Sequence, residues 1–292
     1  MAVTKPSDLL DIQIIGMLAN EKLYSKSSLL SSGFVANANE TARRGGSGTT
    51  ISFPAFTTND TDFETNPKDG NTVTSGSFAM TFRDETIIPV ICPVDIEDSA
   101  LIYMAEVANL EQYIADHVAK QARLEVQGSL ITEAQTTSKT FYGAPSSVAT
   151  QASWDDLVKA KTTNWGEYAF DETDLFVCHS NVAHDLIKSP EAKERGVYGA
   201  NTTVTSGKII EGFAGCSILP LDSITASNGV YPNLILKRDA LMLWSGIAMK
   251  YNEQMKAHTT VWQLDWWFEY AVHLSTQAPV GAIKYFTTST LD

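Results

Sequence analysis

The chain has 292 residues, 43% of them hydrophobic and 19% charged, with a formal net charge of −13, which is typical of a globular protein long enough to bury a core. The acidic balance argues against a protein that wraps nucleic acid, because such binding depends on lysine and arginine neutralising phosphates. No apolar run approaches the about 20 residues of a membrane span, and the first residues carry acids where a secretory signal has an apolar core.

A first helix is predicted near the start of the chain, where Ser7 can cap a run of apolar residues at helical spacing. These residues are Leu9, Ile12, Ile15, Ala19 and Leu23. The serine-rich and glycine-rich stretch that follows, up to Gly48, is typical of an extended arm. Within it, Arg43 and Arg44 are too few for a nucleic-acid patch, so we expect a solvated or partner-facing pair.

Residues 49–91 have the period-two pattern of strands. Apolar side chains alternate with polar ones at Ile51 and Phe53, and again at Phe78, Met80 and Phe82. The polar span between them, residues 57–76, is too long for an ordinary loop inside a compact domain. We therefore predict a long two-stranded finger, which is marginally stable alone and should lie on something else, plausibly another subunit.

A long amphipathic helix is predicted from Pro93 to Ile131. It opens with a proline and several acids, which favour the start of a helix. Seven apolar or small residues then recur every three or four positions: Tyr103, Val107, Leu110, Ile114, Val118, Ala122 and Val126. The helix would extend about 50 Å at about 1.5 Å per residue. Its charges lack the regular pattern of a coiled coil, so a helix lying on a sheet is the favoured interpretation.

A compact mixed α/β unit is predicted next, from alternating short helices and strands. Ser153 can cap a helix that turns Trp154, Leu157 and Val158 inward, and Ser180 can cap a second helix that carries Val182, Ala183, Leu186 and Ile187. Short strands are expected at 175–178, 209–210, 216–219 and 234–236.

The last third contains the sharpest pattern in the sequence, a predicted strand of about 16 residues from Thr260. Every even position is apolar or carries a hydroxyl: Thr260, Trp262, Leu264, Trp266, Phe268, Tyr270, Val272 and Leu274. Such a strand extends about 50 Å, so it could bury its face against the long helix. The aromatic stripe lacks the interleaved lysines and arginines of a single-strand binder, and core packing is favoured.

Three groups of residues have chemistry that could form a site. The cysteines, Cys92, Cys178 and Cys216, are odd in number and far apart, which favours buried thiols in a reducing compartment over a disulfide framework. Cys178 precedes His179, with His184 on the next helix, but neighbours on a strand point to opposite faces and no metal motif supports the group. Asp60, Asp62 and Glu64 alternate as in a calcium loop, yet Thr65 replaces the glycine of the turn, which favours a solvated acidic tip. We therefore expect no catalytic, metal or cofactor site.

The order of these elements resembles the major capsid protein of tailed bacteriophages with the Hong Kong 97-like fold. Three local phrases are also similar to that family: DLFVCHSNVAHDL from Asp174, GKIIEGFAGCSILP from Gly207 and NLILKRDAL from Asn233. The resemblance spans nearly the whole chain and implies an α+β fold. Its parts would be an N-terminal arm (1–48), an extended β-hairpin loop (49–91), a peripheral domain with the spine helix (92–164), a compact α/β axial domain (165–250) and the return strand of the peripheral domain with the C-terminus (251–292).

The resemblance implies a structural protein, not an enzyme, that self-assembles in the host cytoplasm into the icosahedral capsid of a virion. It implies hexamers and pentamers, scaffolding, portal and decoration proteins as partners, and double-stranded DNA enclosed without sequence-specific binding. Residues expected at contacts between copies are Arg43, Arg44, Phe53, Phe56, Phe63, Lys68 and Phe78, and Lys68 could crosslink to a neighbour. Residues expected in the core of the peripheral domain are Val107, Ile114, Val118, Trp262, Trp266 and Phe268.

Two other classes remain open from the sequence. A tail-forming or ring-forming structural oligomer shares the acidic, strand-rich composition. A hydrolytic enzyme would need a convergent polar site, and the sequence has no nucleophile elbow, phosphate loop or dinucleotide-binding motif that would indicate one.

Overall fold

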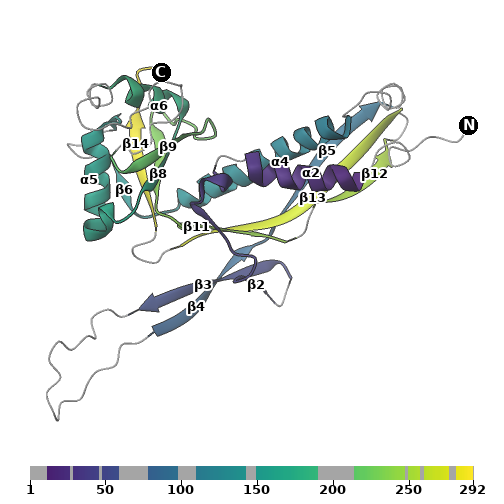
Figure 1. Ribbon diagram of the computed structural model, residues 1–292, viewed down its shortest axis with the longest axis horizontal. Helices are drawn as coiled ribbons and strands as arrows, with labels where there is room; N and C mark the ends of the chain where they lie inside the picture. Colours follow the sequence, from purple (N-terminus) through teal and green to yellow (C-terminus); the bar gives the residue numbers. More distant parts are fainter. Residues whose placement is uncertain are drawn as a thin grey trace, which may run out of the picture.

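The computed structural model describes residues 12–26, 29–45, 48–58, 78–97, 110–142, 149–189, 214–246, 249–256, 260–275 and 281–291. These residues form three parts (Figure 1): a slab of helices on a long-stranded sheet, a helix-and-sheet unit at one end of it, and a hairpin that projects from it. We call them the slab, the end unit and the hairpin.

The centre of the slab is β13 (Val261–Leu274), a strand of 14 residues. Along one side it pairs antiparallel with β5 (Ile88–Glu97). Along the other side it pairs first with β12 (Lys250–Met255) and then with β11 (Leu241–Ser245), which pairs in parallel with β1 (Val35–Asn37). The side chains at even positions 262–270 are buried and those at odd positions 261–269 are partly exposed, so the predicted one-sided strand is confirmed.

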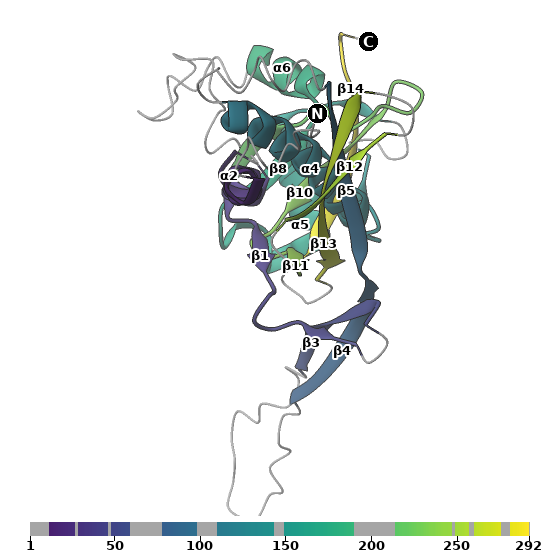
Figure 2. The ribbon, with the colours of Figure 1, turned by 90° about the vertical axis from the view of Figure 1, so that its right-hand side faces the viewer.

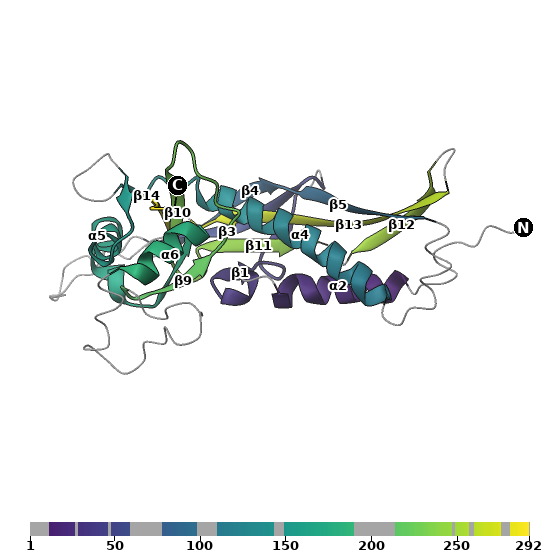
Figure 3. The ribbon, with the colours of Figure 1, turned by 90° about the horizontal axis from the view of Figure 1, so that it is seen from above.

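Two helices cover the buried face of this sheet. α4 (Leu110–Ala134) lies along β13, and α2 (Ile12–Lys26) lies beside α4 (Figure 3). The residues of α4 that face inward follow the predicted helical spacing and are buried: Ile114, Val118, Ala122, Val126 and Leu130. On α2 the predicted Ile15, Ala19 and Leu23 are buried.

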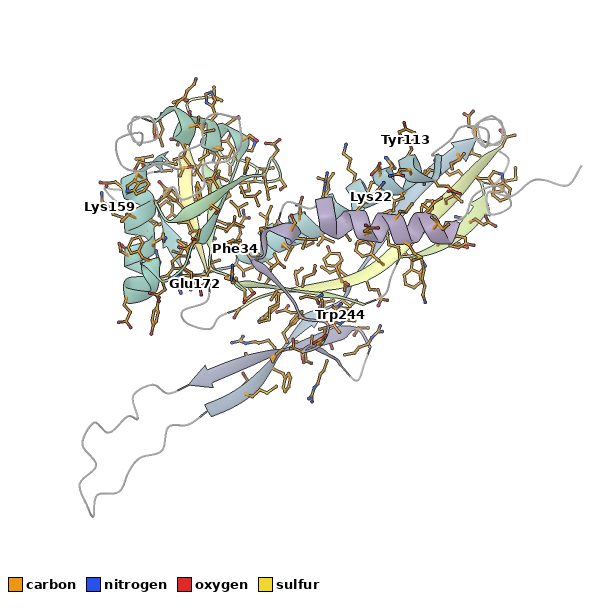
Figure 4. The ribbon with its side chains drawn as sticks, in the orientation of Figure 1. Lys22, Phe34, Tyr113, Lys159, Glu172 and Trp244 are labelled. Carbon is orange, nitrogen blue, oxygen red and sulfur yellow. The ribbon has the colours of Figure 1, made fainter. Side chains whose placement is uncertain are left out.

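Two polar contacts fix the helices in the slab. The Ser129 hydroxyl of α4 hydrogen-bonds to the Tyr270 hydroxyl of β13 at 2.6 Å. The ammonium group of Lys22 on α2 lies 3.0 Å from a carboxylate oxygen of Asp116 on α4. Figure 4 shows Lys22 between the two helices.

The prediction that the long helix begins at Pro93 is wrong, because Pro93 lies within β5. A proline followed by acids is a helix-start signal, but the residues from Ile88 to Ile96 also alternate with period two. Pairing with β13 decides between the two. Within the described residues β5 pairs on one side only, and an edge strand tolerates Pro89 and Pro93, which have no N–H to donate. Val107 and the predicted residues Ser7 and Leu9 lie outside the described residues.

The end unit is built on a six-stranded mixed sheet in the order β6, β14, β10, β8, β9, with β7 also paired to β14. The strands are β6 (Thr140–Phe141), β7 (Thr150–Gln151), β8 (Asp174–Cys178), β9 (Cys216–Pro220), β10 (Tyr231–Leu236) and β14 (Ala282–Thr288). The helices are α5 (Trp154–Trp165), η2 (Gly166–Phe170) and α6 (Ser180–Lys188). Three of the four predicted strands are confirmed as β8, β9 and β10, and residues 209–210 lie outside the described residues.

The helix caps of the end unit agree with the sequence at one helix and differ at the other. The Ser153 hydroxyl accepts a hydrogen bond from the Asp156 N–H and caps α5, as predicted. At α6 the cap is His179, whose ring Nδ1 accepts from the Asn181 N–H. The prediction of Ser180 is therefore wrong by one residue, because an imidazole nitrogen one position earlier satisfies the free N–H. Of the apolar residues on α6, Val182, Ala183 and Leu186 are buried, and Ile187 is 43% exposed.

A buried charged group lies inside the end unit. The ammonium groups of Lys161 and Lys237 are 2.6 Å and 3.1 Å from the two carboxylate oxygens of Asp174, and all three side chains are buried. Each ammonium group also lies over an aromatic ring, Lys161 over Phe170 and Lys237 over Trp165. Burial raises the pKa of the Asp174 carboxyl in spite of the two cations beside it. Asp174 thus links α5, β8 and the end of β10.

The hairpin consists of β3 (Thr50–Thr58) and β4 (Phe78–Thr86). β2 (Arg43–Arg44) pairs with the edge of β3 that is not paired with β4. The two strands of the hairpin pair antiparallel over their full length, as predicted. Figure 2 shows it extending away from the slab. A short helical turn, η1 (Leu30–Ser32), and β1 connect α2 to this region. Among the described helices, none is both long and apolar enough to cross a membrane.

The buried face of β13 can be tested with its two adjacent tryptophans. We expect Trp266→Ala to lower the free energy of unfolding by about 3–5 kcal/mol, because it removes a fully buried side chain from under α4. Trp267→Ala is the matched control. Its side chain is partly exposed with Lys250 over the ring, so we expect a loss of about 1 kcal/mol. Denaturant unfolding measures both, and equal losses would contradict the one-sided packing.

The charged group of the end unit gives a second test. Asp174→Asn leaves two buried ammonium groups without a counter-ion, and we expect it to lower the free energy of unfolding by about 3–5 kcal/mol. The control is Asp155→Asn, which removes the exposed pair with Lys159 and should cost about 0.3–0.5 kcal/mol. An Asp174 variant as stable as the control would mean that the two lysines are hydrated.

Candidate assembly surface

The hairpin presents two faces of different character. In an antiparallel pair, directly opposite residues share a face. Phe53 lies opposite Arg83 and Ile51 opposite Glu85, so these four residues form the inner face. Pro54 lies opposite Phe82, and Met80 is on the same, outer face.

The inner face is covered by the chain itself. Ile51 and Phe53 are 0% exposed and form a small core with Ala38, Ile87 and Ala271, separate from the main one. The Phe53 ring stacks on His273 of β13, with ring centroids 5.3 Å apart. Trp244, labelled in Figure 4 where the hairpin meets the slab, packs against the same core. Phe53, predicted at a contact between copies, is thus enclosed within its own chain in this structure.

The outer face is open along β4, whereas Pro54 on β3 is buried. Met80 and Phe82 are 47% and 43% exposed. The guanidinium group of Arg43 lies over the Phe82 ring, 5.6 Å from its centroid, and extends the face to β2. The outer face thus presents an apolar strip, Met80 and Phe82, bordered by the charged group of Arg43.

Polar contacts join the base of the hairpin to the slab. Nδ1 of His273 lies 2.8 Å from Oε1 of Glu85 on β4. The Arg44 guanidinium lies 3.4 Å from a carboxylate oxygen of Glu269 on β13, so Arg44 is an internal anchor as well as an exposed residue. Glu133, near the end of α4, accepts a hydrogen bond from the Leu274 N–H at 3.4 Å. Burial, and next the negative charge of Glu85, raise the pKa of Glu133.

The remaining predicted residues fall into three groups. Ile114, Val118, Trp262, Trp266 and Phe268 are buried in the slab. Phe56 and Phe78 lie on β3 and β4. Phe63, Lys68 and the acidic residues Asp60, Asp62 and Glu64 lie outside the described residues. Sequence analysis missed Glu85, Glu133 and His273, because they come from three distant segments and no local pattern marks them.

The cysteine and histidine residues have structural contacts. Cys178 is fully buried, and burial raises the pKa of its thiol well above the ordinary value. Burial also raises the pKa of Cys216 to about 12 and of Cys92 to about 11, so these thiols are protonated at neutral pH. The His179 ring stacks on Tyr231, with centroids 4.7 Å apart, while its Nδ1 caps α6. His184 lies beside Asp185, 3.6 Å from a carboxylate oxygen.

No protein-family model matches the sequence, and no curated protein matches it. Solved structures do match the fold over most of the chain. The capsid of Ralstonia phage GP4 superposes with a TM-score of 0.61 and 11% identity, covering 88% of this chain and 87% of that one. The capsid of cyanophage P-SCSP1u gives 0.59 and 14%, covering 88% and 87%. This chain has a capsid fold.

The capsid fold is shared by a further structure, the holo-SrpI encapsulin complex from Synechococcus elongatus PCC 7942. It superposes with a TM-score of 0.59 and 11% identity, covering 89% of this chain and 88% of that one. The α+β capsid fold expected from the sequence is confirmed by these superpositions.

The attachment of the hairpin can be tested by hydrogen exchange. We expect Phe53→Ala to lower the protection of the β3 and β4 amides by the equivalent of about 3–5 kcal/mol, because it empties the core under the hairpin. Phe82→Ala, on the outer face of the same hairpin, should lower it by less than about 1 kcal/mol, the value of its contact with Arg43. A similar loss in the two variants would show that the inner face does not hold the hairpin.

Proposed function

We propose that this chain is the major capsid protein of a tailed bacteriophage, with the Hong Kong 97-like fold, and that it self-assembles into an icosahedral shell. The observation that carries the proposal is the capsid fold, shared over nearly the whole chain with phage capsid structures. Its parts then have the roles expected from the sequence: the arm (1–48), the extended loop (49–91), the peripheral domain (92–164 and 251–292) and the axial domain (165–250).

The hairpin supports this proposal, because it places an apolar strip away from the body of its own subunit. Met80 and Phe82 are exposed in the single chain and would gain burial on a neighbouring copy. Arg43 on the outer face, with Phe56, Phe63, Lys68 and Phe78 along the extended loop, would border the same contact. Many modest contacts of this kind, repeated under closed symmetry, give a stable shell of hexamers and pentamers.

The charge of the chain supports a container for DNA. With a net charge of −13, the wall would repel phosphates, so packaged double-stranded DNA could slide along it without sequence-specific binding. Scaffolding, portal and decoration proteins are the partners such a shell would use. The location would be the virion, after synthesis in the host cytoplasm, and the role would be structural rather than catalytic.

Electron microscopy tests this function. We expect the purified chain, alone or with the products of neighbouring genes, to form closed particles in negative stain. Deletion of residues Thr58–Ser75, closed by a short glycine–serine turn, should leave a folded chain by circular dichroism that forms no closed particles. The physical reason is that the deletion removes the part that covers a neighbour, while leaving the slab and its core intact.

A pair of point variants tests the contribution of the outer face to assembly separately from that of the loop. Phe82→Asp should block assembly without unfolding, since it places a charge in the apolar contact, whereas Phe82→Met keeps an apolar side chain and should assemble. Closed particles formed by the deletion variant would contradict the role of the extended loop. Rings or tubes from the wild-type chain would instead favour the tail-forming or ring-forming alternative, and metal-dependent or hydrolase activity would favour an enzyme.

A further inference from the structure

A cavity of about 360 Å³ lies where the hairpin, the slab and the end unit meet. Its wall comes from the base of β4, the end of α4 with the turn after it, the end of β13 and the start of β14. Five of the residues that line it carry charge or can do so: Arg83, Glu85, Glu133, Lys139 and His273. The segments from β4, from α4 and from the β13–β14 region are far apart in sequence.

Three of these side chains are arranged as metal ligands. Glu85, Glu133 and His273 each offer one ligand atom, and these three atoms lie within 4.8 Å of one another. Around a tetrahedral metal with bonds of about 2.1 Å, ligand atoms are about 3.4 Å apart, so closing the set requires only a small rotation of the two glutamate side chains. The cavity beside them leaves room for a water molecule as a fourth ligand.

The imidazole is already held in place. His273 is 5% exposed, its ring stacks on Phe53, and its Nδ1 is 2.8 Å from Oε1 of Glu85. Glu133 is positioned by the hydrogen bond that it accepts from the Leu274 N–H. Ligands fixed by packing need less ordering when a metal binds. A metal ion between His273 and Glu85 would take the place of the hydrogen that now joins them.

The charge of the cavity wall indicates which kind of metal would bind. Arg83 and Lys139 balance the two glutamates, so with a neutral His273 the wall has no net negative charge. Calcium and magnesium need several oxygen ligands, most often with a surplus of carboxylates. A borderline ion such as zinc accepts imidazole nitrogen and carboxylate oxygen together, and its three-residue sites leave a fourth position open.

We propose that Glu85, Glu133 and His273 form a binding site for a zinc-like divalent metal ion at the junction of the hairpin and the slab. The ion would connect β4 to the end of α4 and to β13, and so would fix the direction in which the hairpin leaves the body. The binding site does not depend on the capsid proposal, and only its effect on assembly rests on that function.

Metal binding to the full-length, untagged chain tests the site. After removal of metals with a chelator, isothermal titration with zinc chloride should show saturable binding, and titration with calcium or magnesium chloride should not. Glu133→Gln should weaken zinc binding by more than about 100-fold, because loss of an outer-shell partner alone costs about 10–100-fold. Glutamine keeps the carbonyl oxygen that accepts from the Leu274 N–H, so this variant should fold.

The control is Glu125→Gln, an exposed glutamate on the same helix, which should bind zinc like the wild type. Zinc should also raise the melting temperature of the wild type and of Glu125→Gln but not that of Glu133→Gln. Equal zinc binding in the Glu133 variant and the wild type, an absence of zinc binding, or a preference for calcium would each overturn the proposal. Zinc binding and melting temperature are measured without reference to assembly. Failure of the metal site would therefore leave the test of shell formation unaffected.

Discussion

The burial of one face of β13 against α4 is the interaction on which the other parts of the molecule depend. Neither element would persist alone, because a long strand needs partners and a long helix needs a surface for its apolar stripe. Packed together, the strand and the helix stabilise each other and form the slab. The hairpin is attached through β5, which continues from β4 after Ile87. The end unit is attached where the chain passes from α4 to β6, from β10 to β11 and from β13 to β14. The positions of both therefore follow from the slab.

The two faces of the hairpin divide its tasks. The inner face, with Phe53 against His273, packs on its own chain. The outer face, with Phe82 and Met80, is exposed and free to contact a partner. Because the base of the hairpin is already packed, an association through the outer face would order fewer groups than the docking of a free arm. Less conformational entropy is then lost when two subunits meet.

The fold could be predicted from the sequence where a pattern repeats over a long stretch. The period of two from Trp262 to Tyr270 and the helical spacing from Ile114 to Val126 each leave one arrangement that buries the apolar residues. The start of the helix could not be predicted in this way, because Pro93 suits both a helix start and an edge strand, and only pairing with a strand far along the chain decides. The cluster of Glu85, Glu133 and His273 has no local signal in the sequence, because the three residues come from distant segments. For Phe53, alternation predicts a buried face but not which molecule covers it.

The position of β13 in the chain has a consequence for biosynthesis. It follows its pairing partners β5, β11 and β12 in sequence order, although it lies between them in space. The central strand of the sheet is therefore synthesised after the strands beside it. Contacts between residues that are far apart in sequence also form slowly. Until β13 emerges, the nascent chain lacks the strand that joins the two sides of the slab. Under the proposed function, translation would therefore postpone assembly until β13 has been made.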